Sequence, residues 1–169
     1  MMLNIAWGKM MLKKIKQKFY SLGDVNILKL YKIGFFCSRK VPANIILKAF
    51  DWAVEQREKG NCIISGFHSQ IEKDVFHYLL KGNQPIILVH GRGLLEREDP
   101  DLMRYVTAGR LLILTPFNKS VKRVTSDTAM KRNKFMIALA DEIFVAYAMK
   151  GGNIDNLLKG LKNKKVATF

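Results

Sequence analysis

From Tyr31 onward the chain alternates short apolar runs with helical patterns, and this alternation limits the fold more than any other feature. The apolar runs cover residues 31–37, 61–65, 85–89, 111–114, 142–148 and 164–168, and helical patterns lie at 43–59, 70–81, 100–108, 128–140 and 153–161. Strands that are buried on both faces have continuous apolar runs, and a helix between two strands lets the second run parallel to the first. The sequence therefore predicts an α/β, Rossmann-like doubly wound fold with a mainly parallel sheet flanked by helices.

Local signals support the helix boundaries. Gly60 is placed to end the first helix, and Asp99 precedes Pro100 at the start of the third. Ser69 and Glu72 have the spacing of a capping box. For the helix at 128–140, we expect a cap from a residue between 126 and 128.

The 169 residues predict one domain at 23–169, preceded by a basic N-terminal extension at 1–22. Residues 1–20 contain five lysines and no acidic residue. This segment could contact nucleic acid, a membrane or a partner, or pack on the domain. No apolar run approaches the ~20 residues of a membrane-spanning helix, so we expect no transmembrane segment.

The chain is strongly basic, with 29 lysines and arginines against 14 acidic residues and a formal charge of +15. Polyanions are the natural partners of such a surface. Nucleic acid is the first candidate and an anionic membrane the second, while a surface that serves only solubility is the third.

Cys37 and Cys62 are the only cysteines, and neither lies in a CxxC pair, so no zinc site is expected. Cys37 ends one predicted strand and Cys62 begins another, which places them at opposite ends of a parallel sheet. We expect both thiols to stay reduced, in agreement with a cytoplasmic location.

Polar residues follow several predicted strands, where the loops of an open α/β sheet line the ligand site. Ser38 and Arg39 follow the first strand, and Ser65 and Gly66 follow the second. Gly91 follows the third, within His-Gly-Arg-Gly. A hydroxyl, a guanidinium and free backbone amides suit a phosphate, and glycine allows the backbone to approach a ligand closely. A polar turn explains the same residues without a ligand.

Later segments extend this candidate site. A basic run contains Lys122 and Arg123, the helix at 128–140 carries Arg132 and Asn133, and the pair Gly151 and Gly152 follows the fifth strand. The acidic residues at 96, 98, 99 and 101 are expected to lie in a solvated turn. No Ser/His/Asp set, HExxH, P-loop or GxGxxG motif occurs, so we expect no catalytic residues, no metal and no cofactor.

Three segments, in this order, resemble the Rossmann-type domain of the DNA-processing protein A (DprA/Smf) family, within the SLOG superfamily. They are KIGFFCSRK at 32–40, IISGFHSQIEKDVF at 63–76 and KRNKFMIALADEIFVAYA at 131–148. The resemblance implies that six residues of these segments surround a phosphate-binding pocket for single-stranded DNA: Ser38, Arg39, Ser65, Gly66, Arg132 and Asn133. It also makes a homodimer plausible, because members associate through this domain.

A second branch of the superfamily, the Lonely Guy-like phosphoribohydrolases, is partly matched by KGGNIDNLL at 150–158. Leu158 stands where that branch has its glutamate, so the resemblance implies nucleotide binding without turnover. The sequence thus predicts binding of single-stranded DNA or a nucleotide phosphate, without catalysis. The alternatives are a nucleoside-monophosphate phosphoribohydrolase and a membrane- or partner-binding module.

Overall fold

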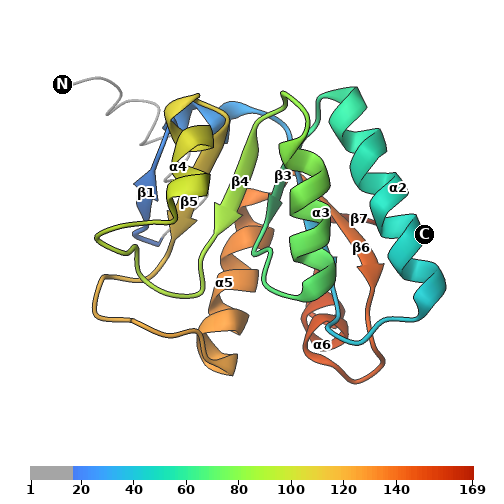
Figure 1. The fold of residues 1–169 in the computed structure, drawn as a ribbon. Helices are drawn as coiled ribbons and strands as arrows, with labels where there is room; N and C mark the ends of the chain where they lie inside the picture. The colour runs from blue at the N-terminus through green and yellow to red at the C-terminus, as the bar shows by residue number, and fades with distance from the viewer. Residues whose placement is uncertain (1–16) are drawn as a thin grey trace.

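A computed structural model describes residues 17–169 and contains one mixed sheet between two layers of helices (Figure 1). The strands are β1 (Tyr20–Leu22), β2 (Lys32–Cys37), β3 (Cys62–Ser65), β4 (Ile86–Val89), β5 (Leu111–Thr115), β6 (Glu142–Tyr147) and β7 (Lys165–Thr168). The helices are α2 (Ala43–Lys59), α3 (Gln70–Leu80), α4 (Pro100–Thr107), α5 (Ser126–Leu139) and α6 (Asn153–Lys159), with the short 3-10 helix η1 (Val25–Lys29) before β2.

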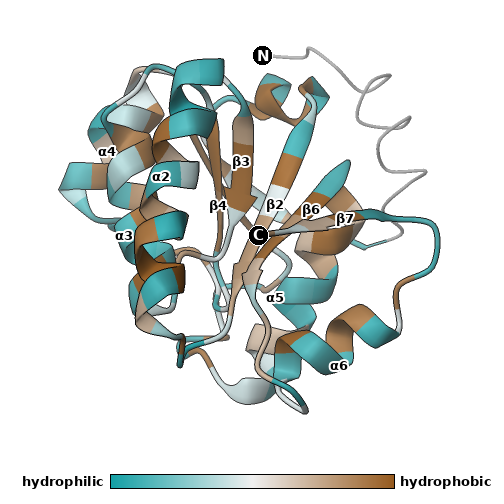
Figure 2. Cartoon of the chain, turned by 90° about the vertical axis from the view of Figure 1, so that its right-hand side faces the viewer, coloured by the Kyte–Doolittle hydropathy of each residue, from teal (hydrophilic) through white to brown (hydrophobic). Residues whose placement is uncertain are grey.

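The sheet has the order β1-β5-β4-β3-β2-β6-β7, and every neighbouring pair except β1 with β5 is parallel. Helices α2, α3 and α4 lie on one face of the sheet, and α5 and α6 lie on the other (Figure 2). The predicted fold class is confirmed. The arrowheads of β3, β4 and β5 point the same way, so their following loops meet at one edge (Figure 1).

The sheet begins earlier in the chain than the sequence predicted. We assigned residues 20–22 to the basic extension, but they form β1, which pairs antiparallel with β5. The signal was missed because a strand of three residues is too short to show a periodic pattern. Phe19, just before it, packs against Phe135 with ring centroids 6.0 Å apart, so this stretch contributes to the core.

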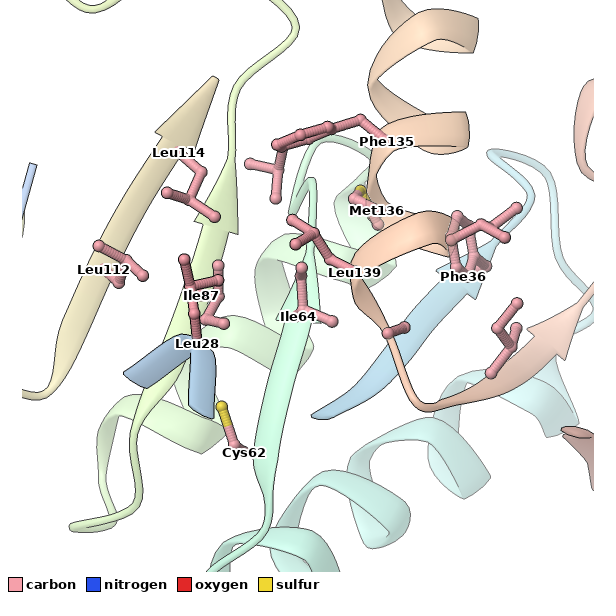
Figure 3. Close-up of a cluster of buried hydrophobic side chains, with 14 of the residues drawn as sticks. Leu28, Phe36, Cys62, Ile64, Ile87, Leu112, Leu114, Phe135, Met136 and Leu139 are labelled. Atoms are coloured by element: carbon pink, nitrogen blue, oxygen red, sulfur yellow. The ribbon is translucent and has the colours of Figure 1, made fainter. Parts of the chain in front are cut away.

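Apolar side chains fill both sides of the sheet. On the α5 side, residues of β3, β4 and β5 meet Phe135, Met136 and Leu139 of the helix (Figure 3). On the other side, α3 presents Val75 and Leu79, both fully buried. Central strands that are buried on both faces explain why their sequences are continuously apolar.

The cysteines lie as predicted. Cys62 pairs in register with Lys32 at the start of β2, whereas Cys37 ends that strand, and both are free and buried. Burial raises the pKa of each thiol to about 12, so both stay protonated at neutral pH.

The helix starts agree with the sequence signals, with one correction. Ser69 and Glu72 form the expected capping box, and Asp99 caps α4. Helix α5 is capped by Thr125 instead of a residue at 126–128, because Thr125 and Thr128 satisfy each other's backbone N–H groups. Within residues 17–169, none of the helices combines the length and apolarity needed to cross a bilayer.

Candidate phosphate-binding site

A hollow of about 310 Å³ opens where the connections from β2 and β6 leave the sheet in opposite directions. We call it the Ser38 hollow. Its lining includes Ser38 and Arg39 after β2, Arg132 and Asn133 from α5, and Gly152 after β6. Ligands of open α/β sheets bind at such a switch point, so the structure brings these five predicted residues together at the expected place.

The two strand ends are tied together by Ser38. Its Oγ accepts a hydrogen bond of 2.9 Å from the Met149 N–H after β6, and its own N–H donates to the Tyr147 carbonyl. This bond uses one of the two acceptor lone pairs of Ser38 Oγ, so the hydroxyl hydrogen remains available to a ligand oxygen.

Arg132 lies at the centre of the site and is only 6% exposed. Its Nε and Nη2 atoms donate to Asn133 Oδ1 over 3.2 and 3.0 Å. Among the described residues, no carboxylate forms a salt bridge with it. Burial lowers the pKa of the guanidinium, Glu72 raises it and Arg39 lowers it, yet an arginine keeps its charge. A buried cation that lacks a direct counter-ion is an unusual and costly arrangement.

Glu72 is a buried acid that acts electrostatically on Arg132, but its carboxylate is already engaged. Glu72 Oε2 accepts hydrogen bonds from the N–H groups of His68 and Ser69, at 2.9 and 3.0 Å. These bonds fix the loop before α3 and leave Glu72 to act on Arg132 only at longer range. His68, which lines the hollow, has its pKa lowered by burial and then by Arg132 and Arg39.

Gly66 has a role that differs from the predicted one. A Cβ atom there would lie 2.6 Å from Arg132 Cζ and 2.7 Å from Nε, closer than any normal approach of two such atoms. The glycine therefore admits the guanidinium of Arg132 against the backbone, where we had expected it to admit a ligand.

Ser65 is also placed differently from its prediction. It is fully buried in β3, its Oγ donates to the Phe35 carbonyl over 2.9 Å, and it accepts from the Phe67 N–H at 3.4 Å. Ser65 does not line the Ser38 hollow and shapes the loop from within. Phe67 has a φ of 43°, which is rare for a residue with a bulky side chain.

A second hollow, of about 570 Å³, lies on the other side of Arg132 between α3 and α4. We call it the His90 hollow. Predicted residues Gly66 and Gly91 line it, and Arg132 and His68 line both hollows. A Cβ at Gly91 would lie 3.0 Å from Val124 Cγ1, so this glycine lets the loop after β5 approach.

Lys122 and Arg123 are exposed and line neither hollow. The residue that follows them, Val124, does line the His90 hollow, so the two cations stand beside its rim. Val121 accepts a hydrogen bond of 2.8 Å from the Gly93 N–H, which uses a backbone donor that an anion-binding turn would need.

Gly151 and Gly152 separate in the structure. Gly152 lines the Ser38 hollow, but Gly151 is exposed with a φ of 73°. The Gly151 N–H donates to Asp155 Oδ2 over 2.8 Å, and its carbonyl accepts from Asn156. Its backbone is therefore used to start α6.

His90 and Glu98 are neighbours of the site that we did not predict from the sequence. Glu98 is only 8% exposed, although we placed it in a solvated turn. Burial raises its pKa, but the Leu95 N–H, Arg92 and His90 outweigh that effect and lower it. Burial is also the main reason that the pKa of His90 falls to about 4, so its imidazole is neutral at pH 7. The signal available in the sequence was Arg92, which stands between two glycines. A guanidinium in such a loop pairs well with a carboxylate, and Glu98 is that partner, with its Oε2 3.5 Å from Arg92 Nη2.

Comparisons with known proteins agree with this architecture. Residues 8–167 match the model of a family described as DNA recombination-mediator protein A. A search of curated proteins found no match. One similar solved structure is DNA processing protein A from Helicobacter pylori, which comes from a study of its single-stranded DNA binding mode. The TM-score is 0.68 at 22% sequence identity, and the match covers 90% of this chain and 71% of that chain.

Two further structures share the fold. DNA processing protein A from Streptococcus pneumoniae gives a TM-score of 0.69 at 18% identity, covering 89% of this chain and 54% of that one. The Moco carrier protein from Chlamydomonas reinhardtii gives 0.50 at 11% identity, covering 83% and 76%. This chain thus spans about half of the Streptococcus protein's length.

Proposed function

Because the chain belongs to the DNA recombination-mediator protein A family, we propose that it binds single-stranded DNA through a backbone phosphate held in the Ser38 hollow. The related protein from Helicobacter pylori is described by its single-stranded DNA binding mode. In this chain the ligand would be a DNA strand or a nucleotide phosphate, bound without catalysis.

One observation carries the proposal. Arg132 is 6% exposed, its guanidinium is held by Asn133, and it has no salt-bridge partner among the described residues. A phosphate oxygen would supply the missing negative charge through charge-assisted hydrogen bonds, which are shorter and stronger than neutral ones. A membrane surface would not reach a buried guanidinium as readily as a strand whose phosphates project singly.

Other features of the site fit a strand. Arg39 and Lys40 line the Ser38 hollow and are exposed, so they can hold neighbouring phosphates. Lys122 and Arg123 extend the positive charge past the rim of the His90 hollow. The formal charge of +15 would then attract the strand at longer range.

The test is a fluorescence anisotropy titration of the chain with a labelled oligothymidylate, repeated at several salt concentrations. Arg132→Ala should weaken binding by at least about tenfold, because a charge-assisted hydrogen bond contributes roughly 1.5–3 kcal/mol. It should also reduce the slope of log K against log salt by roughly 0.7 for each phosphate that the variant no longer neutralises.

Lys162→Ala is the matched control, because Lys162 is an exposed cation that lines neither hollow. It should cost much less affinity. Circular dichroism must show that both variants are folded. Equal losses for the two variants would mean that a diffuse basic surface binds the strand and that the Ser38 hollow does not.

We also propose that the protein works in the cytoplasm and associates as a homodimer. The two buried free thiols suit a reducing compartment. Val166 in the edge strand β7 and Phe169 just after it are 42% and 44% exposed, which suits a contact with a second copy. Sedimentation equilibrium of the wild type and of Val166→Lys would test the association, with a monomer expected for the variant.

A further inference from the structure

A groove of about 540 Å³ lies between α5 and α6, on the face of the sheet that α2, α3 and α4 do not cover (Figure 2). We call it the α5–α6 groove. Its apolar lining consists of Met130 and Ile137 from α5, Leu157 from α6 and Leu161 just after α6. The phosphate proposal leaves this groove unused, because the Ser38 hollow is lined by other residues of the same two helices.

The lining of the α5–α6 groove continues the core to the surface. Ile137 and Leu157 are 8% and 9% exposed and belong to the core cluster, and the half-buried Met130 and Leu161 pack against that cluster. Among the described residues, Lys134 is the only charged one in the lining. The groove therefore suits apolar side chains, whose burial there removes apolar surface from water.

The described part of the chain begins next to α5. Phe19 packs against Phe135 of this helix, and residues 1–16 precede the first described residue, Gln17. Sixteen residues span about 50 Å when extended and about 24 Å as a helix, whereas a helix with its side chains is about 10–12 Å across. Residues 1–16 are therefore long enough to pass over α5 and reach the groove.

The sequence of residues 1–16 has the chemistry that such a groove needs. Apolar side chains recur at helical spacing at Ile5, Leu12 and Ile15, which places them on one side of a helix. Three lysines, at positions 9, 13 and 16, recur on another side. An isolated helix of this length is marginally stable in water, so its apolar side needs a surface on which to pack.

We propose that residues 1–16 dock in the α5–α6 groove of their own chain, with Ile5, Leu12 and Ile15 against its apolar lining. The segment then packs across the two helices that also line the Ser38 hollow. Apolar contact stabilises this docking, because Lys134 repels a segment that has four lysines and no acidic residue. The inference goes beyond the proposed function and does not depend on it.

Maleimide labelling of the thiol introduced by Leu12→Cys in the full chain tests the docking. The two native thiols are buried and protonated at neutral pH, so they react slowly in the folded protein. Met130→Lys places a charge in the groove and should release the segment. The introduced thiol should then react at least about tenfold faster, which corresponds to docking by about 1.4 kcal/mol.

Leu47→Lys is the matched control, because it makes a similar change on α2, across the sheet from the groove, where Leu47 is 67% exposed. It should change the labelling rate at position 12 by less than about twofold. Leu161→Lys is a second groove variant on the α6 side, and it decides the test if Met130→Lys does not fold. Circular dichroism checks the fold of each variant.

Two conditions distinguish this docking from other arrangements of the segment. High salt screens charge but does not weaken apolar contact, so protection of position 12 should persist in it. Protection that disappears in high salt would overturn the proposal, since charge would then hold the segment elsewhere. Protection that disappears on dilution of the protein would also overturn it, because the segment would be docking on a second copy.

Equal labelling rates at position 12 in the unchanged groove and in the folded groove variants would mean that the segment does not use the α5–α6 groove. The labelling needs no DNA, so that result would leave the phosphate site in the Ser38 hollow untouched. Conversely, loss of strand binding by the chain would refute the proposed function without affecting the docking of residues 1–16.

Discussion

Gly66→Ala tests whether the position of Arg132, and not only its charge, determines binding. The new Cβ would lie 2.6 Å from Arg132 Cζ. Carbon atoms in contact are about 3.5–4.0 Å apart, so the guanidinium must move by about 1 Å or more. Such a shift breaks the alignment with Asn133, whose Oδ1 now lies 3.0 Å from Nη2.

Because the alanine leaves the net charge at +15, long-range attraction of the strand is unchanged. Removing one charge-assisted hydrogen bond to the phosphate, worth roughly 1.5–3 kcal/mol, corresponds to at least about a tenfold weaker Kd. The added methyl group should cost about 1–3 kcal/mol of stability by overpacking, so the domain stays folded. Anisotropy titration gives the Kd, and urea denaturation gives the free energy of unfolding.

Gly160→Ala is the matched control. A Cβ there would meet only the Leu157 carbonyl oxygen at 3.6 Å, and Gly160 has a φ of −85°, which alanine adopts without strain. Its affinity and stability should equal those of the wild type. If Gly66→Ala binds the strand as tightly as Gly160→Ala, then the position of the guanidinium does not control the site.

Three other results are expected. After denaturation without reductant, two thiols per chain should react with a thiol reagent. Cys37 and Cys62 lie about five residues, or roughly 16 Å, apart along neighbouring strands, which is too far for a disulfide. Finding one reactive thiol or none would contradict the strand register. Burial lowers the pKa of His90 from 6.5 to about 4, so the neutral imidazole contributes fully to stability above pH 6.5. As the pH drops toward 4, the free energy of unfolding should fall by up to about 3 kcal/mol from this group. Urea denaturation across that pH range should show that His90→Gln removes this pH-dependent loss. Asp141→Ala should lower the free energy of unfolding by about 3 kcal/mol, because it removes the carboxylate that lies 2.9 Å from the buried Lys32 ammonium. Replacing Lys32 with methionine in the same chain should recover part of that stability, because no unpaired charge is then buried.

Much of the fold could be predicted because its signals are local. Apolar runs marked β2 to β6, and a capping box or an N-terminal Asp-Pro marked the starts of α3 and α4. The edge strand β1 has no such pattern, because it has only three residues and pairs with β5 alone. Its existence depends on Leu22 meeting Ile113, a contact between distant segments.

The site could be located but not resolved in detail. Ser38 follows a predicted strand and Arg132 lies near the start of a predicted helix, so both were expected at the edge where the loops of a parallel sheet converge. The family resemblance implied the same pocket. The sequence could not show that Gly66 accommodates a guanidinium, because that depends on the side-chain path of a residue in another element. Nor could it show that Ser65 turns inward to the Phe35 carbonyl, since a serine at a strand end has both options.

The hydrogen bond from the Met149 N–H to Ser38 Oγ joins residues 111 positions apart, and this separation has a consequence for the order of folding. Ribosomes release the N-terminal part first, and pairings between distant segments form late because their loops must close. Strands β2 to β5 pair with sequential neighbours and can assemble early, whereas β6 must then add to the far side of β2. Arg132 and Met149 belong to this last part of the chain. The Ser38 hollow is therefore completed only at the end of folding, and a chain that stops before residue 142 would hold a partial sheet without it.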